Sequence, residues 1–147
     1  MKRALITSSL VVSALLLVTM TGCAATATTC VSWVTHDDPQ AVYDDAMLVV
    51  TGTTLPSTST ASIFGVQVPL HEVVVTVVLK GEAPEGTLLV APAPYTCSTT
   101  QTVDSLDTDE TLILLLTNSE GVWRPLTPTD GVIPLPDDGV LPFDPQK

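Results

Sequence analysis

A run of acidic side chains in the second half of the chain has the residue types that bind hard metal ions. Asp104, Asp107, Asp109 and Glu110 lie close together in the sequence. Carboxylate oxygens are preferred ligands of Ca²⁺, which takes about six to eight oxygen ligands in all. The run lacks the glycine that an EF-hand loop requires. A solvated acidic loop is the favoured interpretation, and a calcium-dependent factor or enzyme organised by residues 104–110 is the alternative.

The two histidines are the other candidates for chemistry, because imidazole transfers protons near neutral pH. His36 is followed by Asp37 and Asp38, a pattern more typical of a solvated turn than of a catalytic pair. His71 precedes Glu72 in a predicted strand, where adjacent side chains point to opposite faces and cannot form a dyad. The sequence also contains no Gly-x-Ser-x-Gly elbow. We therefore predict no catalytic residue, no cofactor and no enzymatic activity.

The N-terminus has the order of residues that is typical of a bacterial export signal. Two basic residues precede an apolar run that is too short for a stable membrane span, and the run ends at Gly22 and Cys23. A small residue directly before a cysteine resembles a lipobox, although Met20 stands where leucine is more usual. The resemblance implies a signal peptide over residues 1–22 and a diacylglycerol on the thiol of Cys23. An ordinary cleaved signal and an uncleaved anchor are the alternatives.

Lipidation would place the mature protein on the extracytoplasmic face of the bacterial cell membrane. Residues 23–29 are a short stretch of alanine and threonine that predicts a lipidated tether. Each buried methylene contributes about 0.8 kcal/mol, so several acyl chains hold a protein at the membrane surface. The predicted membrane contact is therefore the anchor at Cys23.

The charge of the chain excludes one class of partner. The sequence carries 16 acidic and 5 basic side chains. Removal of residues 1–22 leaves only Lys80, Arg124 and Lys147 as basic residues. A strongly acidic protein repels phosphate backbones, so we predict no binding to nucleic acid.

With Cys23 assigned to lipid, two cysteines remain, Cys30 and Cys97. An exported protein reaches a compartment that permits disulfides, and no cluster of histidine or cysteine offers these thiols a metal. We predict that they pair. In the chain-entropy model such a bond stabilises the fold by roughly 4 kcal/mol.

The periodicity of the chain predicts a mainly β domain with one short helix. Asp38 before Pro39 is a helix start, so residues 39–45 are predicted to be helical. Strands are predicted over residues 47–53, within 63–81, over 87–90, over 111–117 and at 122–123. The turn residues at 118–121 predict a hairpin between the last two.

Three further expectations concern the remaining segments. Residues 55–62, rich in serine and threonine, are expected to form a mobile connection. Residues 73–79 are almost continuously β-branched and are expected to form the central strand, covered on both faces, with Trp123 packed nearby. Residues 127–147 are expected to form a proline-rich tail that wraps the domain or frays.

Several segments together resemble a known family. Residues 45–53 (DAMLVVTGT) and 75–82 (VTVVLKGE), then Cys97, then 112–116 (LILLL) leading to 123–125 (WRP), are similar to bacterial domains related to tissue inhibitors of metalloproteinases and netrin modules.

This resemblance implies an OB-like antiparallel barrel of five to six strands over residues 30–126. In the animal inhibitors, the N-terminal cysteine chelates the protease zinc through its free amine and carbonyl. Here Cys23 would be acylated and Cys30 is internal, so that mechanism does not carry over. The function predicted from the sequence is a lipid-anchored, non-catalytic binding module of the cell envelope, whose partner is an extracytoplasmic protein or glycan.

Overall fold

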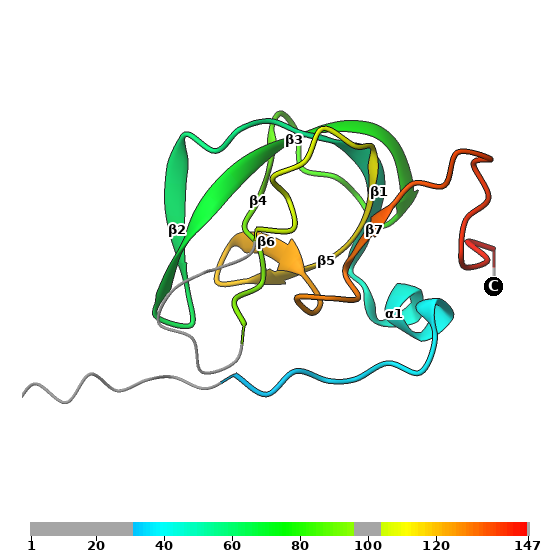
Figure 1. Ribbon diagram of the computed structural model, residues 1–147, viewed down its shortest axis with the longest axis horizontal. Coiled ribbons are helices and arrows are strands. Elements are labelled where there is room, and N and C mark those ends of the chain that lie inside the picture. Colours follow the sequence, from blue (N-terminus) through cyan, green and yellow to red (C-terminus); the bar gives the residue numbers. More distant parts are fainter. Residues whose placement is uncertain (1–30, 96–103, 147) are drawn as a thin grey trace, which may run out of the picture.

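The computed structural model describes residues 31–95 and 104–146. These residues form one helix and seven strands (Figure 1). The helix is α1 (Pro39–Asp45), and the strands are β1 (Leu48–Thr54), β2 (Ser59–Ile63), β3 (Val66–Lys80), β4 (Leu88–Val90), β5 (Leu112–Ser119), β6 (Val122–Pro125) and β7 (Val132–Pro134). Cys23, Cys30 and Cys97 lie outside the described residues, so lipidation and the disulfide stay predictions.

Five of the strands close into a barrel. They follow one another in the order β1, β3, β4, β6 and β5, and the pairing of β5 with β1 completes the circle. Neighbours in the barrel are antiparallel except β4 and β6, which meet in a parallel bridge between Val90 and Trp123. β2 extends the sheet beside β3, and β7 lies beside β5. The predicted mainly β class and small OB-like barrel are confirmed, with two outer strands added.

β1 and β5 supply most of the barrel interior. Leu48 and Val50 of β1 lie among Leu112, Leu114 and Leu116 of β5, and none of these is more than 2 % exposed. The alternate residues of both strands are buried on the outer face, against α1 and the C-terminal segment. A strand covered on both faces needs apolar residues at every position, which explains the continuous apolar runs of β1 and β5.

The prediction that residues 73–79 form a strand covered on both faces is wrong. Val73 belongs to the interior cluster and Val75 packs against it, but Val74 and Val77 are 50 % and 48 % exposed. The second layer of the fold covers β1 and β5 instead, and residue types alone do not reveal which strand that layer covers. Trp123 does pack against the cluster that contains Val73, as expected.

Helix α1 has the bounds that its start signal predicts. The Asp38 carboxylate accepts a hydrogen bond from the backbone N–H of Ala41 (2.8 Å), and Pro39 occupies the first turn. At the other end, Lys80 Nζ donates to the carbonyl oxygens of Tyr43 (2.7 Å) and Asp44 (2.8 Å). A cation at the C-terminal carbonyls complements the helix dipole. Among the described residues, no helix is long and apolar enough to span a membrane.

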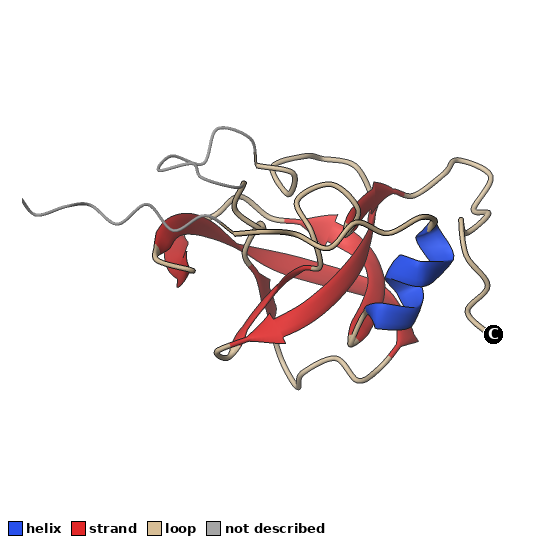
Figure 2. Cartoon of the chain, turned by 90° about the horizontal axis from the view of Figure 1, so that it is seen from below, coloured by secondary structure: helices blue, strands red, loops and turns tan. Residues whose placement is uncertain are grey.

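The C-terminal segment wraps the barrel, one of the two outcomes expected for residues 127–147. β7 pairs with β5, and the ring of Phe143 stacks on Tyr43 with centroids 4.6 Å apart. The Tyr43 hydroxyl donates to the carbonyl oxygen of Pro145 (3.2 Å). Figure 2 shows this segment passing the outer side of α1. The segment thereby belongs to the second layer of the fold.

Two hairpins project from the barrel. The turn between β5 and β6 falls where the sequence predicts it, with Glu120 and Gly121 in the left-handed region. The second hairpin is unexpected, because all of β2 except Ile63 lies in residues 55–62, the segment predicted to be a mobile connection. Its turn at Phe64 and Gly65 has φ values of 51° and 79°, as two-residue hairpin turns require. The sequence did not reveal this strand, because its side chains are mostly exposed and include serine and threonine in place of an apolar run.

Candidate functional site

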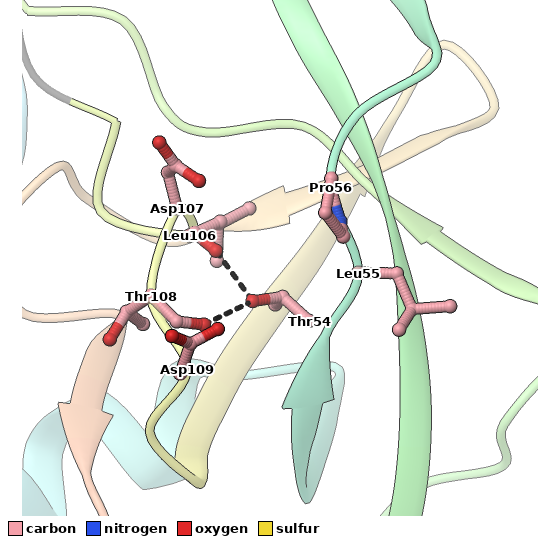
Figure 3. A pocket seen from close by; sticks show the side chains of 7 residues that line it. All are labelled: Thr54, Leu55, Pro56, Leu106, Asp107, Thr108 and Asp109. Carbon is pink, nitrogen blue, oxygen red and sulfur yellow. Dashed lines mark hydrogen bonds between the residues drawn. The ribbon is translucent and has the colours of Figure 1, made fainter.

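The structure does not gather the four acidic candidates into one site. Asp104 turns inward, whereas Asp107 and Asp109 line a small pocket of about 110 Å³ beside Thr54. Figure 3 shows their carboxylates pointing in different directions. Thr54 Oγ1 donates to the carbonyl oxygens of Leu106 and Thr108, which holds the loop against the end of β1. No group of three or more His, Cys, Asp or Glu in residues 31–95 and 104–146 could hold a metal ion.

Asp104 instead forms a buried pair with His71, which sequence reasoning did not find. His71 Nε2 lies 2.8 Å from Asp104 Oδ2, and His71 Nδ1 lies 2.9 Å from the carbonyl oxygen of Leu55. Both ring nitrogens face oxygen acceptors, so both bonds are made when the ring carries two N–H groups. Asp104 Oδ1 accepts a further bond from the backbone N–H of Leu106 (3.0 Å).

This pair holds two segments of the fold together, and we call it a structural pin. His71 is 2 % exposed, and each of its ring nitrogens already has a partner. A general base needs a ring nitrogen within reach of the proton it takes from a substrate. The geometry therefore indicates that His71 and Asp104 fix the acidic loop to β3 and to the connection after β1.

His36 lies in a different environment from the predicted solvated turn. Its side chain is only 5 % exposed, and Nε2 lies 3.1 Å from Asp45 Oδ2. On the other side of the ring, Nδ1 lies 3.9 Å from Asp130 Oδ2 and has no hydrogen-bond partner among the described residues. The neighbours in sequence, Asp37 and Asp38, do not bond to the imidazole; two carboxylates from later segments flank it.

His36 belongs to the wall of a cleft of about 280 Å³. The extended segment 31–36 forms one side of this cleft, and the barrel with the tip of the β2–β3 hairpin forms the other. The lining combines the rings of Trp33 and Phe64 with an imidazole, a guanidinium, a carboxylate, three hydroxyl groups and three aliphatic side chains: Val31, Ser32, Trp33, Val34, His36, Asp45, Phe64, Thr117, Arg124, Leu126 and Thr127. It therefore offers both charged and flat apolar surfaces to a ligand.

Arg124 is held rigidly in this cleft. Its guanidinium carbon lies 5.1 Å from the ring centre of Trp33 and 5.2 Å from that of Phe64. The two rings meet edge to face, with centroids 5.9 Å apart. Nε donates to Ser119 Oγ (3.2 Å), and Nη1 donates to the carbonyl oxygens of Pro125 (3.0 Å) and Leu126 (3.2 Å). Burial lowers the pKa of Arg124 from its ordinary value.

One edge of the guanidinium remains available. An arginine has five N–H donors, and the described residues accept bonds only from Nε and Nη1 of Arg124. The donors on Nη2 have no acceptor among the residues that the structure describes. A preordered guanidinium loses little entropy when it binds a carboxylate, carbonyl or hydroxyl oxygen. The cleft can thus bind an oxygen acceptor on Nη2 and an apolar group on the aromatic rings.

Trp33 also connects the cleft to the segment that leads to Cys97. Its Nε1 donates to the carbonyl oxygen of Pro94 (3.1 Å). This bond joins two positions that are each three residues from a cysteine of the predicted pair, Cys30 and Cys97.

Sequence reasoning missed the residues that build the cleft, because Trp33, Phe64 and Arg124 come from three distant segments. The one available signal was their scarcity, since the chain has two tryptophans, two phenylalanines and five basic residues. No protein-family model matches this chain, and a search of curated proteins finds no significant match.

Proposed function

We propose that this protein is a lipid-anchored, non-catalytic binding module on the extracytoplasmic face of the bacterial cell membrane. Its partner is an extracytoplasmic protein or glycan, and its binding site is the cleft between segment 31–36 and the barrel. The observation that carries the proposal is Arg124, fixed between Trp33 and Phe64 with its Nη2 donors open.

The composition of the cleft supports binding over catalysis. Aromatic side chains and arginine are the residues most enriched among those that dominate binding free energies. Proteins and glycans both carry carbonyl, carboxylate or hydroxyl oxygens for Nη2 and apolar faces for the rings. His71 does not line the cleft, and the unpartnered Nδ1 of His36 is buried and faces Asp130, so neither histidine offers an exposed ring nitrogen as a base.

The membrane anchor rests on the order of residues at the N-terminus. The basic pair, the apolar run and Gly22-Cys23 are not features that a β domain requires. Cys23→Ala should abolish incorporation of a labelled fatty acid and release the protein from the membrane fraction. Label that persists in Cys23→Ala would overturn the lipoprotein assignment.

The binding site can be tested by photo-crosslinking in native membranes. Phe64 is 40 % exposed in the cleft wall, so benzoylphenylalanine at this position keeps the phenyl ring and has room for its added benzoyl group on the solvent side. The expected result is one discrete adduct that Arg124→Gln weakens strongly. The same photo-probe at Val140, which is 64 % exposed and outside the cleft lining, is the matched control. Equal adducts at both positions, or none at Phe64, would refute a specific site in the cleft.

A further inference from the structure

The second half of β3 has an open edge. Residues 73–80 pair with β1 on one side, while on the other side β4 pairs only with residues 71–73. Among the described residues, no backbone hydrogen bond reaches residues 74–78 from the side opposite β1. In a strand with one neighbour, the N–H and C=O groups that point away from that neighbour have no ladder partner.

This open edge has one register shift, where Thr51 and Gly52 face Val77 and Val75, but it has no charged or proline residue to oppose strand addition. Natural edge strands carry lysine, proline or inward-pointing charges, contain bulges, or are very short. Residues 74–78 read Val-Val-Thr-Val-Val, and Val74, Val77 and Val78 are 50 %, 48 % and 43 % exposed. The nearest lysine, Lys80, directs Nζ to the carbonyl oxygens at the end of α1. The edge therefore presents free backbone groups beside exposed valine side chains.

The charges around the edge have one sign. Glu72 precedes the open stretch, Glu82 and Glu85 follow it, and all three are exposed. All 16 carboxylates of the chain lie within the described residues, together with only two basic side chains, Lys80 and Arg124. Two copies of such a chain repel each other, whereas a basic segment is attracted.

We propose that residues 74–78 of β3 bind an extended, basic segment of another protein by β-strand addition. The backbone of the partner would pair with the open edge. Its apolar side chains would contact Val74, Val77 and Val78, and its basic side chains would lie near the glutamates. The edge shares no residue with the cleft, so this binding does not depend on the function proposed above.

A synthetic heptapeptide of alternating lysine and valine is a suitable probe, measured by fluorescence anisotropy with the purified full chain. The expected result is saturable binding that weakens at least tenfold when all backbone nitrogens of the peptide are methylated, since this removes the pairing donors from both edges of the peptide. A peptide with glutamate in place of lysine should bind at least tenfold more weakly. Equal binding of the methylated peptide would overturn strand addition, because only charge attraction would remain.

A pair of protein variants tests the location. Val77→Lys places a charge beside the open edge and should weaken binding at least tenfold, whereas Val140→Lys adds the same charge at a more exposed position and should not. On peptide addition, hydrogen exchange should slow within residues 74–78. Equal losses in both variants would overturn the site. If the full chain forms a dimer and Val77→Lys dissociates it, the edge binds a second copy of this chain. That result would overturn the proposed basic partner.

Discussion

Removal of the Asp104 carboxylate should destabilise the protein far more than removal of its acidic neighbours. In Asp104→Ala, the imidazole of His71 loses its 2.8 Å partner and the N–H of Leu106 loses its acceptor. Bonds to charged groups contribute about 1.5–3 kcal/mol each, and the Asp104 carboxylate takes part in two of them. The Asp104 side chain is 20 % exposed, so we expect about 3 kcal/mol.

Urea unfolding followed by circular dichroism measures this loss, and Asp107→Ala is the matched control. Asp107 lies in the same loop, but no hydrogen bond engages its side chain among the described residues, so its removal should cost less than about 0.5 kcal/mol. A double-mutant cycle with His71→Ala should show a coupling of about 2 kcal/mol. Equal losses in Asp104→Ala and Asp107→Ala would refute the assignment of a structural pin.

Three further outcomes can be measured. Val75→Asp, in the packed face of β3, should lower the free energy of unfolding by several kcal/mol in thermal melts. Val77→Asp should lower it by less than about 1 kcal/mol, because Val77 is half exposed. Similar losses in the two variants would contradict the faces assigned to these residues. Gly52→Ala should lower stability by about 2 kcal/mol, because a Cβ there would clash with the carbonyl oxygen of Val74; an unchanged melting temperature would contradict this contact. Mass spectrometry of unreduced peptides should show the Cys30–Cys97 bond, and two alkylatable thiols would rule it out.

Local signals in the sequence predict the elements that depend on local physics. The start of α1 follows from Asp38 and Pro39, since an N-cap acceptor and a proline both act within the first turn. The β5–β6 hairpin follows from the turn residues at 118–121. The number and spacing of the strands predict a mainly β domain, whereas the closed barrel is expected only from the family resemblance.

The sequence does not show which layer covers which strand. Residues 73–79 and 112–116 look equally apolar, yet only the second segment is covered on both faces. The cover comes from Tyr43 and Phe143, which are one hundred residues apart in the chain. The same long-range packing joins His71 to Asp104 and Trp33 to Arg124, so no local pattern could have predicted these pairs.

The two walls of the cleft differ in mechanical stiffness. Phe64 stands at the tip of a hairpin whose second strand, β3, continues without a break for 15 residues into the barrel ladder. The opposite wall, residues 31–36, has no backbone hydrogen bond to the rest of the described chain and is fastened through side chains such as Trp33 and His36. Loss of the side-chain bonds of Trp33 and His36 would therefore release this wall of the cleft without breaking any strand ladder.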